Sequence, residues 1–448
     1  MRVPQNPPSM WPILTSLLQD RPELALKGSA TTPDGRYLHW EELRYRQPPE
    51  GLAVQEWWAT TKWARTQRLT PIQAMKSLYP LDFGFVQLPT IQAELHDFDR
   101  KNVGRELFTA LGNHDLLAEY RVRQLIEEAI NSSVLEGARP TTRELARQLV
   151  RENRPPATRD EKMILNNWHA MKRIVELKDE NRPLVVDDVL ELHRILGENA
   201  LEVPDAEGQL RGSTDPVVVQ DLEGTIWHTP PPAEGLRERI ARLLRFAEDG
   251  AVDGSNAFIH PVIRAIIVHF WIGYEHPFRD GNGRIARALY YWCMLRHGYE
   301  LAEFLSISGP IDRAPKAYYQ AFAFTETDDG DLTYFVLHQL KVMREALSEL
   351  TNHLKERAAS MKELARTVAG FDSLNHRQRA LLQHAVHHPL ESYTIEAHAE
   401  AHLVHYQTAR NDFVDLVEMG YFVARRVGRG KRYFPAESLS KKLKEPLS

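Results

Sequence analysis

Hydrophobic residues recur at helical spacing through most of this chain. From about residue 106 to 350, apolar positions repeat every three to four residues in successive segments, as expected of amphipathic helices around a core. The β-branched runs on either side of "DLEG" interrupt this pattern and predict a small β-hairpin around Val217 to Trp227. The pattern therefore predicts a mainly α-helical core that carries a hairpin.

The ends of the chain follow other patterns. Residues 1–105 are mixed, with a strand and then a helix expected in "GFVQLPTIQAELHDFDR", and no catalytic cluster, so we expect an accessory region. Residues 351–373 continue a long charged helix and predict a linker. Residues 374–438 predict three helices and then two strands around "GRG", which is the order of a winged helix-turn-helix.

Composition narrows the class of protein. At 448 residues the chain exceeds one typical domain. The net charge of −5 argues against general binding to nucleic acid or to an anionic membrane, although a local basic patch stays open. A single cysteine, Cys293, excludes an internal disulfide and a cysteine-rich zinc module. With no signal peptide or membrane span expected, we predict a cytoplasmic protein.

The stretch "HPFRDGNGRIAR", His276 to Arg287, concentrates the candidate chemistry. Pro277 disfavours helical geometry at His276, so the preceding helix should end there. His276 can accept a proton near neutral pH. Gly281 and Gly283 permit a tight turn that brings backbone N–H groups close to an anion. The stretch thus predicts a base beside an anion site.

Charged residues of the same stretch suit a polyphosphate. A helix beginning near Arg284 would direct its positive end at the turn, and Arg287 lies on the same helix face. Asp280 offers a carboxylate of the kind that Mg²⁺ prefers. A base, a metal ligand and a phosphate cradle together predict displacement at phosphorus.

This stretch resembles the signature of the Fic (filamentation induced by cAMP) family, His-Pro-Phe-x-Asp-Gly-Asn-Gly-Arg-x-x-Arg. The flanking segments "HPVIRAIIVHFWIGYE", "VLELHRIL", "HTPPP" and "DLTYFVLHQL" are similar to the family as well, over roughly residues 106 to 345. The resemblance implies transfer of AMP from ATP to a Ser, Thr or Tyr hydroxyl of a target protein, with release of pyrophosphate.

The resemblance also implies residue roles. His276 would be the general base, Phe278 would anchor the loop, and Asp280 would bind Mg²⁺. The hairpin resembles the family's flap, which aligns a target segment by strand pairing. The remaining residues would bind the ATP phosphates, with Arg287 at the γ-phosphate: Gly281, Asn282, Gly283, Arg284 and Arg287.

Several alternatives stay open. Gly283 argues against a relative that phosphorylates its target, which has Lys there, but transfer of UMP or phosphocholine is not excluded. A rival of another class is a DNA-binding regulator whose core senses nucleotide. Retention of His276 and Asp280 favours an enzyme, because a sensor needs no base. The target, which could be the chain itself, and a homodimer also stay open.

An upstream segment, "SSVLEG", matches the family's inhibitory signature. Ser132 and Glu136 lie four residues apart on one helix face, and Gly137 ends that helix, expected at about 120–137. The resemblance implies that Glu136 pairs with Arg287 and inhibits transfer within one chain. The same Glu136 could instead position water for removal of AMP.

The C-terminal module carries two further signals. Five basic residues lie between Arg425 and Arg432 on the expected wing, which suits contacts with DNA phosphates. A purely structural or protein-binding module is the alternative. Six histidines could suggest a metal site, but without Cys or an acidic ligand pattern we expect exposed helix residues: His384, His387, His388, His398, His402 and His405.

Overall fold

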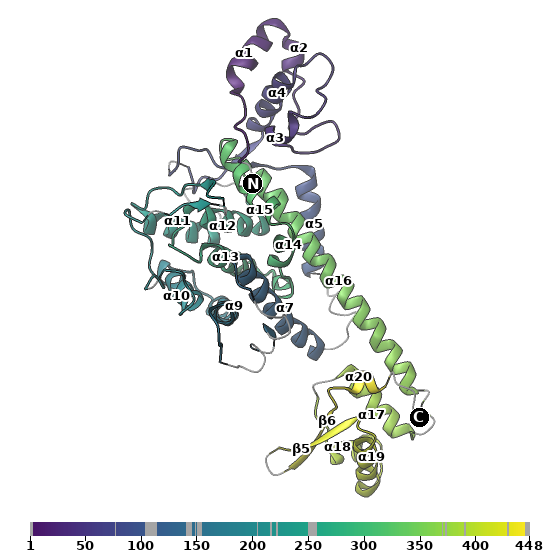
Figure 1. The fold of residues 1–448 in the computed structure, drawn as a ribbon. Coiled ribbons are helices and arrows are strands. Elements are labelled where there is room, and N and C mark those ends of the chain that lie inside the picture. Colours follow the sequence, from purple (N-terminus) through teal and green to yellow (C-terminus); the bar gives the residue numbers. More distant parts are fainter. Residues whose placement is uncertain are drawn as a thin grey trace. The chain divides into compact units, whose positions relative to one another are not determined.

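The computed structural model (Figure 1) describes residues 3–76, 78–103, 114–139, 146–147, 149, 155–203, 205–215, 217–220, 223–249, 258–369, 371, 374–388, 391–427 and 430–443. The chain forms two compact units. The first unit comprises Met1–Asn102 and Gln124–Leu347, and the second comprises Val103–Arg123 and Ser348–Ser448.

Both units are mainly α-helical, which confirms the predicted fold class. The helices of the N-terminal region are α1 (Met10–Asp20), α2 (Pro22–Ala25), α3 (Trp40–Leu43), α4 (Val54–Thr66) and α5 (Pro89–Val103). The following helices are α7 (His114–Leu135), α9 (Arg159–Asp179), α10 (Val186–Gly197), α11 (Leu236–Asp249), α12 (Pro261–Glu275), α13 (Asn282–Arg296), η1 (Glu300–Phe304), α14 (Ser308–Arg313), α15 (Pro315–Thr327) and α16 (Thr333–Ala369). None of the described helices combines the length and apolar character needed to cross a membrane.

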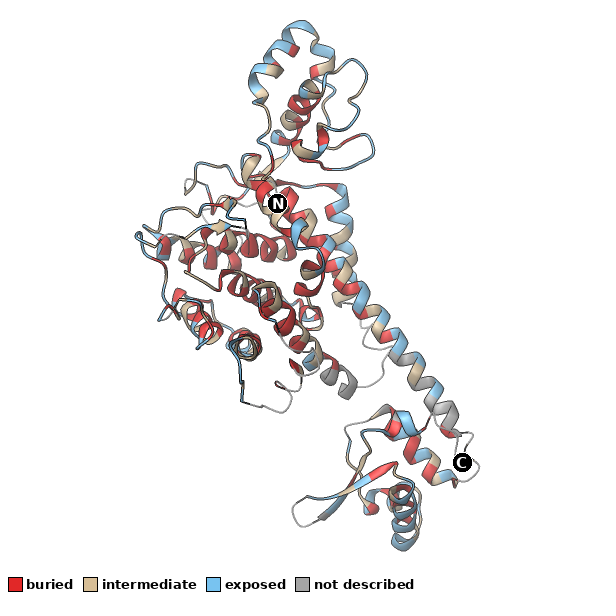
Figure 2. Cartoon of the chain, in the orientation of Figure 1, coloured by how far each residue is buried: buried red, intermediate tan, exposed pale blue. Residues whose placement is uncertain are grey.

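Helices α12 and α13 form the centre of the first unit. Nearly every residue of α12 is buried, because its sequence is apolar on all faces and not only on one stripe. The two helices pack along each other, and Figure 2 shows both as predominantly buried. The loop that joins them, His276 to Gly281, is therefore held at both ends by buried helices.

The N-terminal region packs onto this core. Strand β2 (Gly84–Val86) precedes α5, as the sequence predicted, and pairs antiparallel with β1 (Leu69–Pro71). The buried Arg65 of α4 donates to the carbonyls of Ala30 and Leu38 and, at 2.7 Å, to the hydroxyl of Tyr334 on α16. A buried guanidinium is stable only when its donors are satisfied in this way. The region thus contributes packing to the first unit.

The second unit has the predicted order of elements: α17 (His376–His387), α18 (Ile395–Ala401), α19 (Tyr406–Glu418), β5 (Phe422–Val427), β6 (Gly430–Pro435) and a further short helix, α20 (Leu439–Lys442). The expected linker 351–373 falls on the second half of α16 as far as Ala369. The expectation of exposed helix histidines is wrong for His398, which is buried. Its ring lies 3.1 Å from the Asp412 carboxylate, because α18 packs against α19.

Candidate active site

His276 leaves helix α12 in a left-handed conformation. The helix ends at Glu275, as Pro277 predicted, and His276 follows as its C-cap with φ 46°. Its Nδ1 lies 3.3 Å from the carbonyl oxygen of Gly273, to which it donates a hydrogen bond. Among the described residues no hydrogen-bond partner of Nε2 is found. Burial lowers the pKa of His276 to about 4, so the ring is neutral at pH 7 and Nε2 is a proton acceptor.

The loop after His276 is closed by its own side chains. Asn282 accepts a hydrogen bond from the Phe278 N–H at 2.9 Å and donates to the Phe278 carbonyl at 2.8 Å. The buried Phe278 ring stacks on His193 of α10 with 3.7 Å between ring centroids. Gly281, with φ 83°, starts α13, which begins at Asn282, two residues before the expected position. Asn282 and Phe278 thus fix the Gly281–Gly283 turn, here called the anion turn, to the core.

Two residues that the sequence analysis did not single out support the loop. His193 accepts from the Gly208 N–H at Nδ1 and donates to the Asp280 carbonyl at 2.8 Å from Nε2. Arg211 donates to the carbonyls of His276 and Glu275, which are left without helical partners at the end of α12. The sequence signal for His193 is a histidine on the apolar face of an amphipathic helix; for Arg211 there is none.

Arg284 has the properties of an anion ligand. Its side chain is buried, and Nη1 donates to the Leu196 carbonyl at 3.0 Å. Nε and Nη2 are buried without a hydrogen-bond partner in the described part of the chain. Because buried donors are normally satisfied, these two nitrogens are available to a bound anion. The side chain lies beside the turn, with Nη2 3.7 Å from the Asp280 carboxylate.

Asp280 is positioned at the start of α13 by two backbone N–H groups. One carboxylate oxygen accepts from Gly281 at 2.5 Å and the other from Glu202 at 3.0 Å. The side chain is about a quarter exposed, so the carboxylate is accessible from solvent. A single accessible carboxylate beside a phosphate site suits Mg²⁺, which takes few protein ligands and fills its shell with phosphate and water.

Arg287 is joined to the segment that carries Ser132 and Glu136. Its Nε donates to the Ser132 hydroxyl at 2.8 Å, and its Nη2 donates to the Ser132 carbonyl at 2.9 Å and to the Glu136 carboxylate at 3.0 Å. Glu136 also closes over Gly283, where an added Cβ would approach its carboxylate oxygen to 2.1 Å. Gly137 follows with φ 93° and ends the helical turn. The carboxylate thus lies on the anion turn itself.

Glu128 fixes α7 in this position. Its buried carboxylate accepts from the hydroxyl of Ser306 and from the hydroxyl and N–H of Ser308, at the start of α14. The positive end of a helix stabilises a carboxylate placed there. Since Glu128 lies two turns before Glu136, this contact sets the position of the segment that reaches Arg287.

A cavity of about 170 Å³ lies beside the turn and is lined by His276, Asn282, Gly283, Arg287 and Glu136, with aromatic walls from Tyr318, Tyr319, Phe322 and Trp227. Pockets for drug-sized ligands usually measure roughly 300–1,000 Å³. The carboxylate of Glu136 forms part of the wall, so the cavity is narrow in this state. Five of the predicted site residues thus line this cavity, and the other predicted residues do not line it: Ser132, Asp280, Gly281 and Arg284.

The predicted hairpin forms one rim of this cavity. Strand β3 (Val219–Gln220) pairs antiparallel with β4 (Ile226–His228). His228 lies 2.7 Å from the Glu326 carboxylate of α15 and 2.7 Å from the Tyr274 carbonyl of α12, which fixes the hairpin next to His276. Residues 221 and 222 of the hairpin lie outside the described residues.

Comparison with known proteins agrees with this geometry. Residues 183–294 match the model of the Fic/DOC family. The chain contains a Fic domain. The match includes His276, Asp280, Arg284 and Arg287, together with His193 and Arg211, so the Fic domain holds the motif and the residues that support its loop. Ser132 and Glu136 precede the matched residues.

Two relatives illustrate the sequence similarity of the Fic domain. The protein adenylyltransferase fic-1 of Caenorhabditis briggsae is 32% identical over 127 residues, 28% of this chain and 22% of the relative. The protein adenylyltransferase Fic of Nematostella vectensis is 31% identical over 125 residues, 28% of this chain and 26% of the relative. The chain thus spans about a quarter of these relatives. A Fic family protein from Desulfovibrio desulfuricans superposes with a TM-score of 0.49 at 20% identity, covering 79% of this chain and 98% of that one.

Proposed function

We propose that this chain is a protein adenylyltransferase that moves AMP from ATP to a Ser, Thr or Tyr hydroxyl of a protein and is restrained by Glu136. The observation that carries the proposal is the state of His276. Its Nδ1 proton is donated to Gly273, and its Nε2 is an acceptor at the wall of the cavity. The resemblance of the Fic domain to proteins named adenylyltransferases supports the same reaction.

The reaction follows from the side chains around the cavity. The target hydroxyl attacks the α-phosphorus of ATP and gives its proton to Nε2 of His276. The bond from the α-phosphorus to the bridging oxygen breaks, and pyrophosphate leaves. The N–H groups of Asn282 and Gly283 would take up phosphate charge, together with the two Arg284 nitrogens that have no hydrogen-bond partner in the described chain. Positioning and charge stabilisation supply most of the catalysis in such reactions.

Asp280 would hold Mg²⁺ against the ATP phosphates. Its accessible carboxylate and its place beside Arg284 fit a hard cation shared with phosphate oxygens. When bound, the ion neutralises phosphate charge. The carboxylate itself is oriented by the N–H groups of Gly281 and Glu202.

The hairpin would present the target. Val218 and Ile226 expose apolar side chains on and next to its strands, with 37% and 52% of their surface accessible. An extended segment of a partner can pair with the edge of such a hairpin through backbone hydrogen bonds. Since His228 fixes the hairpin to α12, the paired hydroxyl would be delivered toward His276.

Labelled nucleotide tests the proposal directly. The Glu136→Gly chain is incubated with α-labelled ATP, Mg²⁺ and cell lysate, and labelled proteins are identified by mass spectrometry. The proposal expects covalent AMP on protein hydroxyls, and parallel reactions with UTP and CDP-choline test the other donors. Nucleotide binding with no label on any protein would favour a sensor instead.

The pH dependence of transfer should reflect the lowered pKa of His276. Only the neutral ring accepts a proton, and burial holds the pKa near 4, so the base stays competent as the pH falls from 7.5 to about 5.5. We expect the acidic limb of kcat/KM in the Glu136→Gly chain to lie below pH 5, measured at saturating Mg²⁺ with circular dichroism as a folding control. Half-loss of the rate near pH 6.5 would contradict a buried, neutral base.

A second function, DNA binding, is favoured by the surface of the β5–β6 hairpin. Arg425 pairs across the strands with Arg432, and Arg426 with Lys431, and all four are exposed. Changing Arg426 and Lys431 to Ala should weaken DNA binding and lower its log–log salt slope by roughly 0.9 for each lost phosphate contact. Arg245→Ala with Lys316→Ala, two exposed cations of the first unit, is the matched control. No binding by the parent at low salt would instead favour a protein partner.

A further inference from the structure

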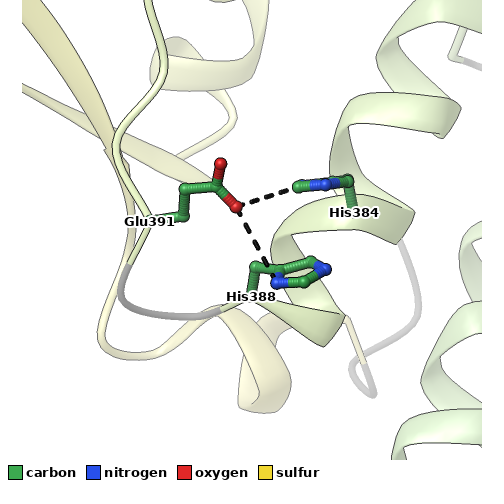
Figure 3. A group of neighbouring side chains, drawn as sticks. All are labelled: His384, His388 and Glu391. Atoms are coloured by element: carbon green, nitrogen blue, oxygen red, sulfur yellow. Dashed lines mark ion pairs between the residues drawn. The ribbon is translucent and has the colours of Figure 1, made fainter. Parts of the chain in front are cut away.

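Three side chains of the second unit converge at the end of helix α17. His384 lies in the last turn of that helix, His388 is its C-cap, and Glu391 follows after the helix ends (Figure 3). One ligand atom of each residue lies within 4.8 Å of those of the other two. The sequence analysis set the histidines aside because no acidic ligand was evident, and the fold now supplies Glu391.

The distances from the Glu391 carboxylate to the two histidines are close to those between ligand atoms of one metal ion. The Glu391 carboxylate oxygen lies 3.7 Å from Nδ1 of His384 and 3.8 Å from Nδ1 of His388. These separations are too long for hydrogen bonds. Ligand atoms of tetrahedral Zn²⁺, at 2.0–2.1 Å from the metal, lie roughly 3.3 Å apart. A contraction of about half an ångström would bring the two separations from Glu391 to this value, and the two histidine ligand atoms lie within 4.8 Å of each other.

We propose that His384, His388 and Glu391 form a binding site for a divalent transition metal, with Zn²⁺ as the best fit. Two imidazoles and one carboxylate are a known Zn²⁺ ligand set that leaves the fourth position to water. Mg²⁺ prefers oxygen ligands, so this site and the proposed ATP site select different ions. The proposal does not depend on the function of the Fic domain.

Neighbouring groups set the conditions for binding. The His384 and His388 rings are stacked with 4.2 Å between centroids, so both imidazoles lie on the same side of the end of α17. The Tyr393 hydroxyl lies 2.9 Å from Nδ1 of His384, so a metal at that nitrogen must displace this contact. Tyr393 itself is held by a backbone bridge to Tyr433 of β6. The metal would thus join the end of α17 to the segment beside β6.

Equilibrium dialysis of the full chain against Zn²⁺, with excess Mg²⁺ present, tests the site. The parent should bind one Zn²⁺ per chain at a free concentration of about 10 µM or below. His384→Ala and His388→Ala should each weaken binding by about 100-fold, and Glu391→Gln, which keeps the side-chain shape, by at least about 10-fold. His405→Ala, at an exposed histidine of the same unit, is the matched control and should bind as the parent does.

Two further readouts separate metal binding from a folding defect. Co²⁺ in place of Zn²⁺ should give the visible absorption of a tetrahedral ion in the parent, and Tyr393→Phe should bind equally or more tightly because the competing hydroxyl is gone. Absence of 1:1 binding in the parent, or binding that survives both His→Ala changes, would overturn the proposal.

Discussion

His276→Ala is expected to reduce AMP transfer by about 10²–10⁴-fold while ATP still binds, because loss of a general base typically has an effect of this size. In the proposed site the phosphates would rest on the Gly281–Gly283 turn and on Arg284, whereas the His276 side chain contacts the Gly273 carbonyl. The measurement is label transfer from α-labelled ATP by the Glu136→Gly chain with and without the change. ATP affinity is followed in parallel by calorimetry.

His96→Ala provides the matched control, since His96 is an exposed histidine of α5 in the same unit. It should leave both transfer and ATP binding unchanged. Undiminished transfer by His276→Ala would remove His276 from the role of base. Loss of ATP binding together with transfer would instead assign the side chain to the nucleotide site.

Glu136→Gly is expected to raise transfer by on the order of 10²-fold, since a misplacement of about 1 Å at the reacting centre can have that effect. The Glu136 carboxylate accepts a hydrogen bond from Nη2 of Arg287 at 3.0 Å. It also lies over Gly283, where the phosphates would otherwise bind. A guanidinium fork suits a carboxylate or a phosphate but does not bind both through the same donors. Self-modification at saturating ATP and Mg²⁺ is the simplest measurement.

Three comparison variants sharpen this test. Ser132→Ala removes a hydroxyl that accepts a hydrogen bond from Arg287 but keeps the Glu136 carboxylate, so it should activate less than Glu136→Gly. Glu136→Gln keeps the shape without the charge and should fall between them. Arg287→Ala should not activate, because it would lose the proposed phosphate contact together with the proposed inhibitory contact. If Glu136→Gly removes AMP from modified protein more slowly than the parent and gains no transfer, Glu136 serves the reverse reaction.

The site was predictable where its residues are local in sequence. The motif from His276 to Arg287 places its base, its turn and its cations within a loop and one helical turn, so spacing alone relates them. The end of α12 at Glu275 and the left-handed Gly281 follow from Pro277 and from the conformational freedom of glycine. The helical order of both units followed in the same way from apolar periodicity.

Contacts between segments that are distant in the sequence could not be predicted from local spacing. His193 lies 87 residues from the Asp280 carbonyl that it holds, and Glu128 lies 180 residues from Ser308. A histidine or glutamate on the inner face of a helix looks the same in sequence whether it supports a catalytic loop or only fills the core. The roles of these two side chains appeared only once the helices were packed, because a buried polar group must find its partner across the core.

The sequence by itself determined which residues could perform phosphorus chemistry, because the base, the turn and the arginines are neighbours along the chain. Tertiary structure decided the protonation, hydrogen bonding and accessibility of these residues. It lowered the pKa of His276 by burial, left two Arg284 nitrogens without hydrogen-bond partners in the described chain, and brought Glu136 onto Arg287. It also brought Glu391 beside His384 and His388. Burial and long-range pairing depend on the packing of whole helices, and no local spacing specifies them.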